Sequence, residues 1–427
     1  MRRLRFKSFL GDEAGAALIL FALSLPVLVA LSGLAVDVGL WYTKKRELQT
    51  VADSAALAAG WEKARGATTA VAQAAALTEA RRNGYSAGNG AALAVNSPPT
   101  SGSRSGSNLA AEAIVEEPTE LFFSTAIVDQ QFMIRARSVA ELQSVGVVCV
   151  LALDTTADRA ADFTGNTASN FSDCIVAANS TSASAIRIGG SGSLSAYTLW
   201  TAGNISGQAT TTIDPTERGI AIADPYANLA ISSFAGCLQT NYAINPGQTI
   251  TLVPGAYCNG LDIRGTAHLT PGTYLIDQGD LTVNATAVVD CPGCTGGTGV
   301  TFILTRRAGQ PASQIGGARI NGGATVTLVA PQSGDYAGIL FYQDRRASNG
   351  PSGVDRFNGG STMSLSGALY FPSQEVDFNG NNGAVLSNCT QIVAREITFS
   401  GASNASHNGC DGQGVTAIHA QRVQLVE

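Results

Sequence analysis

The stretch from Val253 to Val289, VPGAYCNGLDIRGTAHL followed by TPGTYLIDQGDLTVNATAVV, decides the fold of most of this chain. Each half begins with a Pro-Gly-x-Tyr turn and continues into short apolar runs, and Pro254 and Pro271 lie seventeen residues apart. A looser pair, GILFYQ from Gly338 and GALYFP from Gly367, extends the pattern. Apolar runs between turn residues predict strands, and repeats of roughly twenty residues are typical of solenoids whose coils stack on one another.

The same texture runs from about residue 146 to the end of the chain. We therefore expect residues 146–427 to form a Gly- and Asn-rich all-β solenoid, with a right-handed parallel β-helix as the first choice. A β-sandwich also consists of short strands and stays as the alternative. Asn-rich segments such as NGNNG from Asn379 suit turns and amide ladders stacked between coils.

Composition narrows the class of protein. A chain of 427 residues predicts two or three domains, and 45% hydrophobic residues can build a core. Charged residues make up 14%, the net charge is -6, and all four lysines lie before residue 64. Nucleic-acid binding needs clustered cations, so we expect no nucleic-acid partner.

The cysteines indicate an oxidising compartment. All eight follow residue 148, and an even number in one region is typical of disulfides. Neighbouring positions suggest the pairs Cys149 with Cys174, Cys237 with Cys258, Cys291 with Cys294, and Cys389 with Cys410. Eight cysteines allow 105 connectivities, so other pairings stay open.

Near the N-terminus, the run AALILFALSLPVLVALSGLAV from Ala16 to Val36 carries no charge. At about 1.5 Å per residue it is long enough for a hydrocarbon core of about 30 Å. It predicts a membrane-spanning helix over residues 16–39. The residues expected to mark this anchor are Ala16, Leu20, Pro26 and Val36 in the span and Trp41 and Tyr42 at the interface.

The orientation of the anchor follows mainly from the cysteines. Basic residues flank the apolar run on both sides and favour a cytoplasmic N-terminus only slightly. Because the cysteines need an oxidising compartment, residues 1–15 are expected in the cytoplasm and the C-terminal region on the opposite side of the membrane. In a bacterium these are the two sides of the inner membrane, with the C-terminal region in the periplasm. A cleaved signal peptide is the alternative, although GLWYTKKREL offers no small-x-small cleavage site.

Between anchor and repeats, residues 40–145 predict an α+β region. Residues 42–82 read as a helix that continues out of the membrane, with Leu48, Val51, Ala55 and Ala59 on one face, and Asn83 and Gly84 end it. This face suits a core helix or one that contacts partner helices. Residues 95–108 predict a loop, and AEAIVEEPTELFF and QFMIRARSVAEL predict two strands.

These residues resemble a family. The run from Gly15 to Gly60 is similar to the N-terminal region of TadE/TadG-like proteins, components of the machinery that builds Flp (tight-adherence) pili. The match rests on Leu25 with Pro26, the stretch Gly33 to Asp37, Trp41 with Tyr42, and LQTVADSAALAAG from Leu48.

The resemblance implies a TadG-like accessory protein of pilus assembly. Pilin-like members have a Gly followed five residues later by Glu, which prepilin peptidase reads, whereas this chain has Leu20 five residues after Gly15. We therefore expect a membrane-retained protein whose partners are the membrane, pilin or other assembly proteins, and envelope glycans. Processing by either peptidase stays open.

Two other functions stay open as alternatives. A surface adhesin or carbohydrate-binding β-helix protein would use an aromatic and Asn-rich face. A polysaccharide-cleaving enzyme would need converging carboxylates, for which Asp262, Asp277, Asp280 and Asp290 are the candidates. Solenoid turns carry Asp for structural reasons as well, so we expect no enzyme and no catalytic residue.

Metal and cofactor sites are not expected either. TadG relatives often carry a von Willebrand A domain with a D-x-S-x-S metal motif, and this chain offers only Asp154, Thr156 and Asp158 there. The CPGC segment from Cys291 lacks a second CxxC and nearby histidine pairs, so it predicts a stapled turn rather than a zinc site.

Overall fold

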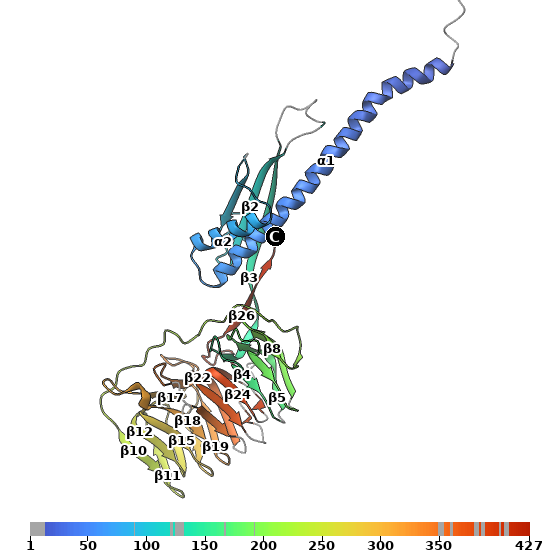
Figure 1. The fold of residues 1–427 in the computed structure, drawn as a ribbon. Coiled ribbons are helices and arrows are strands. Elements are labelled where there is room, and N and C mark those ends of the chain that lie inside the picture. The colour runs from blue at the N-terminus through green and yellow to red at the C-terminus, as the bar shows by residue number, and fades with distance from the viewer. Residues whose placement is uncertain are drawn as a thin grey trace, which may run out of the picture. The chain divides into compact units, whose positions relative to one another are not determined.

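The computed structural model describes residues 13–88, 90–119, 123, 132–165, 168–191, 193–348, 354–358, 362–379, 384–385, 389–400, 403–404 and 410–427 (Figure 1). The chain divides into two compact units. Unit 1 comprises Met1–Gln143 and Val423–Glu427, and unit 2 comprises Ser144–Arg422. Residues 1–12 of the expected cytoplasmic segment and residues 380–383 of the NGNNG segment lie outside the described residues.

Unit 1 begins with the long helix α1, Glu13–Ala64, in which Pro26 is tolerated. Gly66 ends this helix with a φ of 76°, a left-handed conformation that costs glycine little. The N–H of Gly66 donates to the carbonyl of Lys63, and that of Ala67 donates to the carbonyl of Glu62. These two bonds form a Schellman motif and satisfy the last carbonyls of the helix.

The second helix, α2, spans Thr69–Arg82. The prediction of one helix over residues 42–82 is therefore wrong, because Gly66 divides it into two. The predicted end holds: Gly84 has a φ of 98°, and the N–H of Tyr85 donates to the carbonyl of Ala80.

The two helices pack against each other mainly through alanine side chains. Because the methyl group is small, alanine lets two helix backbones approach closely while it still buries apolar surface. The predicted apolar face of α1 lies in this core, and the buried residues of the two helices are Leu48, Val51, Ala52, Ala55, Ala56, Ala59, Ala72, Ala76 and Ala80.

An antiparallel sheet completes unit 1. It consists of β1 (Ala92–Asn96), β2 (Ala110–Thr119) and the first part of β3 (Phe132–Ala152). The two predicted strands are β2 and β3, which pair from Ala110 opposite Glu141 to Thr119 opposite Phe132. Strand β1 was not predicted, and it takes the first two residues of the expected loop.

The chain passes between the units twice. It leaves unit 1 along β3 and returns along β26, His419–Leu425. The N–H of Val148 donates to the carbonyl of Ile418 at 2.8 Å, and that of Val139 donates to the carbonyl of Glu427 at 2.8 Å. The two connections are thus hydrogen-bonded to each other in both units.

Unit 2 is built of short strands. They are β4 (Ala161–Phe163), β5 (Ala168–Ala178), β6 (Ile186–Ile188), β7 (Ser193–Thr201), β8 (Ile205–Ser206), β9 (Thr210–Thr211), β10 (Gln239–Ile244), β11 (Thr249–Leu252), β12 (Gly255–Ile263), β13 (Thr266–Leu269), β14 (Gly272–Asp277), β15 (Gly279–Val283), β16 (Val288–Asp290), β17 (Val300–Thr305), β18 (Ile315–Ile320), β19 (Thr325–Val329), β20 (Ile339–Gln343), β21 (Val354–Asn358), β22 (Thr362–Asn379), β23 (Ala384–Val385), β24 (Thr390–Phe399) and β25 (Ser403–Asn404). A short 3₁₀ helix, Ala312–Gln314, precedes β18.

The strand ladders of unit 2 do not follow chain order. From β10 the parallel pairing runs through β12, β14, β17, β20 and β22 to β24. Strand β24 then pairs with β3 and β4, the first strands of the unit, and β3 continues through β5 to β7. The beginning of unit 2 therefore lies in the middle of the stack, where Figure 1 shows green strands beside red ones.

The return segment, residues 212–238, connects β9 at one end of the stack to β10 at the other. Side chains of the sheets hold its backbone. Trp200 Nε1 donates to the carbonyl of Ile220 at 2.8 Å, and Tyr342 Oη donates to the carbonyl of Leu229 at 3.0 Å. These bonds satisfy backbone groups that the segment cannot pair within itself.

Columns of apolar side chains fill the interior of the stack. One column follows the strand register through Ile263, Val283, Ile320, Phe357, Phe378, Phe399 and Phe163. The ring of Phe399 stacks 5.0 Å from that of Phe378 and 5.0 Å from that of Phe163. The column is thus continuous where the late strand β24 meets the early strand β4.

An amide ladder lies at the turns, as the asparagine content predicted. Asn321 Nδ2 donates to Asn284 Oδ1 at 3.3 Å, and Asn358 Nδ2 donates to Asn321 Oδ1 at 3.3 Å. Each rung is 37 residues from the next.

The predicted fold class is confirmed in two broad features, an N-terminal apolar helix and a large β-rich unit, whereas the separate helix α2 was not predicted. Every pairing described in unit 2 is parallel, whereas the strands of an immunoglobulin-type sandwich pair antiparallel.

The Phe163–Phe399 contact offers a test of the unusual strand order. Replacing the fully buried Phe399 by Ala should destabilise unit 2 by about 3–5 kcal/mol, because a buried ring is lost and a cavity remains. Urea unfolding of the detergent-solubilised full chain, followed by tryptophan fluorescence, measures this. Val253→Ala, at an exposed position, is the control, and equal midpoints for the two variants would contradict the described packing.

Candidate functional site

The first candidate surface is the N-terminal part of α1. Between Leu18 and Leu40 this helix exposes a nearly continuous series of large apolar side chains. It is the one helix among the described residues that is long and apolar enough to cross a membrane. Of the predicted anchor residues, Leu20, Val36 and Tyr42 are exposed, Pro26 lies inside the helix, and the side chain of Ala16 lies outside the described part.

An acidic residue interrupts this apolar surface. The side chain of Asp37 is only 1% exposed. The backbone N–H of Phe123 donates to both carboxylate oxygens of Asp37, at 3.2 and 3.1 Å. One helical turn before, a Cβ atom on Gly33 would lie 2.8 Å from the Cβ of Phe123, so only glycine leaves room for this contact.

Contacts between α1 and the β2–β3 hairpin continue along the helix. The rings of Trp41 and Phe132 lie 5.7 Å apart. Lys44 forms a salt bridge of 2.7 Å with Glu117, and Lys45 Nζ donates to the carbonyl of Arg135. Trp41, predicted as an interfacial anchor, therefore packs against protein as well.

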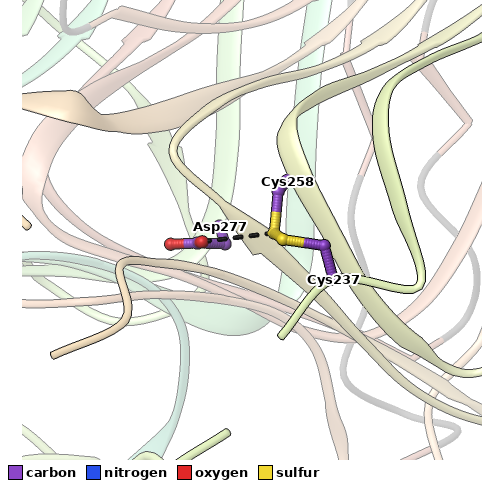
Figure 2. Close-up of side chains that lie close together, drawn as sticks. All are labelled: Cys237, Cys258 and Asp277. Carbon is purple, nitrogen blue, oxygen red and sulfur yellow. Dashed lines mark hydrogen bonds between the residues drawn. A yellow bond between two sulfur atoms is a disulfide. The ribbon is translucent and has the colours of Figure 1, made fainter. Parts of the chain in front are cut away.

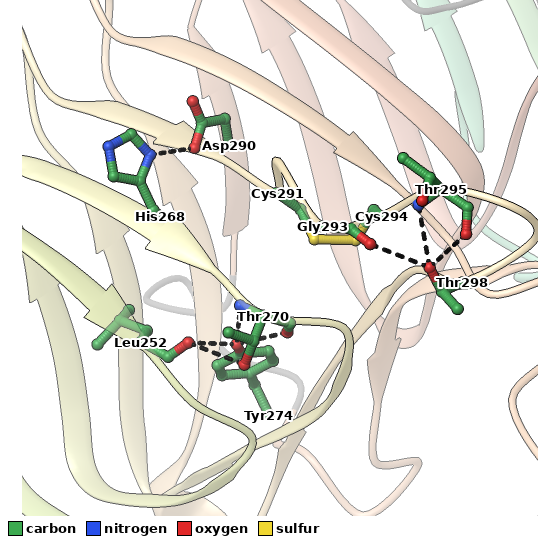
Figure 3. The surroundings of a disulfide bond; sticks show 10 residues. All are labelled: Leu252, His268, Thr270, Tyr274, Asp290, Cys291, Gly293, Cys294, Thr295 and Thr298. Carbon is green, nitrogen blue, oxygen red and sulfur yellow. Dashed lines mark hydrogen bonds and ion pairs between the residues drawn. A yellow bond between two sulfur atoms is a disulfide. The ribbon is translucent and has the colours of Figure 1, made fainter.

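The cysteines of unit 2 lie in four bonded pairs. These are Cys149–Cys174, Cys237–Cys258, Cys291–Cys294 and Cys389–Cys410, the same pairs that neighbouring positions suggested. Figure 3 shows the Cys291–Cys294 bond, which closes a tight turn in which the N–H of Cys294 donates to the carbonyl of Cys291 at 3.0 Å.

One disulfide has an unusual environment. Asp277 is fully buried, and its Oδ2 lies 3.3 Å from Sγ of Cys258 (Figure 2). Arg307 compensates the carboxylate with its side chain at 2.9 Å and its backbone N–H at 2.8 Å. Among the described residues, Cys237, Cys258 and Asp277 are close enough to hold a metal ion, but the two sulfurs are bonded to each other and offer no thiolate.

The four candidate carboxylates have separate partners. Asp262 accepts from Arg264 and Asn284, and Asp290 Oδ1 lies 2.5 Å from His268 Nδ1 (Figure 3). Asp277 pairs with Arg307 as described, and Asp280 Oδ1 accepts the N–H of Gly317 at 2.9 Å. Each carboxylate thus has a structural partner of its own.

The segment at the place of the von Willebrand metal motif has an equally structural role. Asp154 Oδ1 accepts the N–H groups of Thr156 and Ala157 at 2.9 and 2.8 Å, and Asp154 Oδ2 lies 3.3 Å from Arg395 Nη1. Asp158 accepts from Ser182 instead. The segment therefore closes a turn, as Asp often does in loops.

Asp280 lines a polar pocket that sequence reasoning missed. The pocket holds about 420 Å³, and its walls carry amides, hydroxyls, one carboxylate and one guanidinium. It is lined by Asn259, Gln278, Gly279, Asp280, Ser313, Gln314, Ile315, Gly316, Gly317, Arg319, Ser348 and Gln374. Gln278 is 8% exposed, and its Nε2 has no hydrogen-bond partner among the described residues.

A buried carboxyl supports one wall of this pocket. Asp355 is fully buried, and its Oδ1 accepts the N–H of Ala318 at 2.6 Å. Burial, helped by the nearby charge of Asp280, raises the pKa of Asp355 well above its ordinary value. Asp355 and Phe357 share one face of β21 and both point inward, a period-two signal that the sequence did contain.

The raised pKa of Asp355 gives a pH prediction. The folded chain keeps a proton on this carboxyl that the unfolded chain releases above about pH 4, so stability falls as the pH rises through the folded pKa. Asp355→Asn removes this dependence. Its melting temperature relative to the unmodified protein should therefore be higher at pH 8 than at pH 4.5. Asp158→Asn, at an exposed position, should show no such trend, and parallel behaviour of the two variants would refute the prediction.

Comparison with known proteins adds one match. Residues 15–78 match a family model described as putative Flp pilus-assembly TadE/G-like. No curated protein and no solved structure gives a match. The matched residues include the exposed part of α1, the Gly33–Asp37 segment and the helix pair of unit 1 up to residue 78. The resemblance drawn from the sequence is confirmed at these residues, which are similar to the TadE/G-like family of putative Flp pilus-assembly proteins.

Proposed function

We propose that this protein is a membrane-anchored accessory component of Flp pilus assembly. The observation that carries the proposal is the TadE/G-like segment at residues 15–78, whose helix exposes a long apolar surface. In water such a surface would aggregate, whereas in a bilayer it is solvated by lipid tails. The anchor would be a single pass through the bacterial inner membrane.

The proposed orientation has the N-terminus in the cytoplasm and unit 2 in the periplasm. All eight cysteines lie in unit 2 in bonded pairs, and disulfides persist in an oxidising compartment such as the periplasm. The basic residues that precede α1, among them Arg2, Arg3 and Arg5, agree with this orientation.

The accessory role is favoured over that of a pilin subunit. Leu20 takes the place of the glutamate that pilin-like relatives carry after the processing site, and it lies exposed on the apolar surface of α1. In this proposal the chain stays in the membrane and contacts pilin or other assembly proteins.

Unit 2 would serve as a rigid interaction domain. We infer that its parallel ladders form a solenoid, since paired strands in successive layers place apolar side chains in the same inward-facing columns. We also propose that it has no catalytic activity, because the candidate carboxylates Asp262, Asp277 and Asp290 are each engaged by a structural partner.

Removal of the gene tests the proposal. A deletion strain should produce normal amounts of pilin but lack surface pili, and the full chain supplied in trans should restore them. Electron microscopy of cells and immunoblots of sheared and cellular fractions measure both quantities. Normal piliation in the deletion strain would sink the proposed role.

Glycan binding by unit 2 is the second candidate, and the polar pocket beside Asp280 favours it. Amides, hydroxyls, a carboxylate and a guanidinium are the groups that hydrogen-bond sugar hydroxyls, and the pocket of about 420 Å³ is of ligand size. The aromatic face expected of an adhesin is less suitable, because the stacked rings of unit 2, such as Tyr257 with Tyr274 and Phe378 with Phe399, are buried.

If the pocket binds envelope glycans, Arg319→Ala should reduce binding of the purified protein to isolated peptidoglycan or to surface polysaccharide by roughly tenfold or more, as loss of a charged hydrogen bond implies. His268→Ala, which changes a side chain outside the pocket, is the matched control. Equal binding by both variants argues against a glycan site here.

A further inference from the structure

Exposed apolar side chains gather at the end of the β2–β3 hairpin in unit 1. Phe123, Phe132 and Met133 are 52%, 44% and 53% exposed. Thr119 of β2 pairs with Phe132 of β3, so these residues belong to the end of the hairpin that is far from the Ala110–Glu141 pair. At about 3.3 Å per residue, the two ends of the hairpin lie roughly 30 Å apart.

Specific contacts fix the position of this hairpin end along the axis of α1. Phe123 lies against Gly33 and donates its N–H to Asp37, and Phe132 lies against Trp41. Gly33 is seventeen residues beyond Ala16, the first residue of the predicted span. Seventeen residues of helix rise about 25 Å, slightly less than the hydrocarbon thickness of about 30 Å. If α1 spans the membrane from Ala16, Phe123 lies near the outer hydrocarbon boundary.

Charged groups follow on the side away from the helix N-terminus. Lys44 pairs with Glu117 and Lys45 reaches the carbonyl of Arg135, about two helical turns beyond Asp37. With increasing distance from the N-terminus of α1, the side chains of both α1 and the hairpin thus change from apolar to basic. This order matches the order of layers in a bilayer, where aromatic residues lie at the interface and basic residues reach the headgroups.

We propose that the end of the β2–β3 hairpin, with Phe123, Phe132 and Met133, inserts into the outer boundary of the membrane that α1 spans, as a second interfacial anchor. Gly33 and Asp37 are the positioning residues that hold it against the helix. The inference rests on the proposed membrane anchoring of α1. It also explains how Asp37 is tolerated next to an apolar span, because the hairpin backbone binds its carboxylate and shields it from lipid.

Single cysteines can test the position of the hairpin. The described part of the unmodified chain has no free cysteine, so an introduced thiol is the reactive one. The full chain is placed one copy per nanodisc of phosphatidylethanolamine and phosphatidylglycerol and is treated with a membrane-impermeant maleimide. Three variants are compared: Phe123→Cys at the hairpin end, Leu25→Cys in the apolar part of α1, and Leu109→Cys.

Leu109 is a matched control, because it is 52% exposed like Phe123 but lies beside the opposite end of the hairpin. The Phe123→Cys variant should react at least about tenfold more slowly than the Leu109→Cys variant if lipid covers residue 123. The discs contain only lipid and one chain, so neither pilin nor a second copy can account for the protection. Equal rates at residues 123 and 109, with residue 25 protected, would overturn the inference and leave the anchor intact. Rapid labelling at residue 25 would instead refute the anchor itself.

A pair of glycine variants tests the positioning role. Gly33→Leu places a side chain where Phe123 lies, whereas Gly39→Leu meets no atom within 4 Å of its Cβ position. Combined with Phe123→Cys, the Gly33→Leu change should raise the labelling rate towards that of the Leu109→Cys variant, and Gly39→Leu should not. If both changes leave residue 123 equally protected, Gly33 does not hold the hairpin against α1.

Discussion

Backbone pairing between β24 and β3 is the interaction on which the rest of unit 2 depends. Ile392, Val393 and Ala394 lie in register with Val150, Leu151 and Ala152, although about 240 residues of chain separate the two strands. Parallel neighbours cannot be joined by a tight turn, so the early and late parts of the unit can form one stack only if this long loop closes. The four disulfides do not assist this closure, because the largest sequence separation that any of them spans is 25 residues. They connect neighbouring strands, as Cys149–Cys174 does between β3 and β5, or close single turns, as Cys291–Cys294 does. The junction itself is held by hydrogen bonds and by the stacked rings of Phe378, Phe399 and Phe163.

Local features of this architecture could be predicted from the sequence, and long-range ones could not. The turns near Pro254 and Pro271, the asparagine ladder and the apolar face of α1 depend on residues a few positions apart or on composition. The position of β24 beside β3 depends on register between distant segments, for which a single sequence carries no signal. Gly66 did carry a signal for the end of α1. The alanine-rich sequence on both sides of it has high helix propensity, so one continuous helix was predicted.

The candidate sites also include some that the sequence predicted and some that it did not. The candidate membrane span was visible because a run of about twenty uncharged, mostly apolar residues is rare outside membrane spans. The shielding of Asp37 by Phe123 was not visible, since the two residues are 86 positions apart. For Asp355 the sequence offered one local signal, its common face with Phe357, which indicates that it points inward. Chemistry that depends on which polar groups meet in space therefore had to come from the structure.

The paired connections between the units have a mechanical consequence. Strand β3 leads into unit 2 and β26 leads out, and hydrogen bonds join the two on either side of the passage. Tension between α1 and unit 2 would load the covalent backbone of β3 while it shears the bonds to β26, and bonds loaded in shear resist together rather than one after another. A linker of one flexible strand would stretch under the same force. Because the bonds to β26 lie in both units, a pull on the chain would have to break several of them at once before β26 separates from β3.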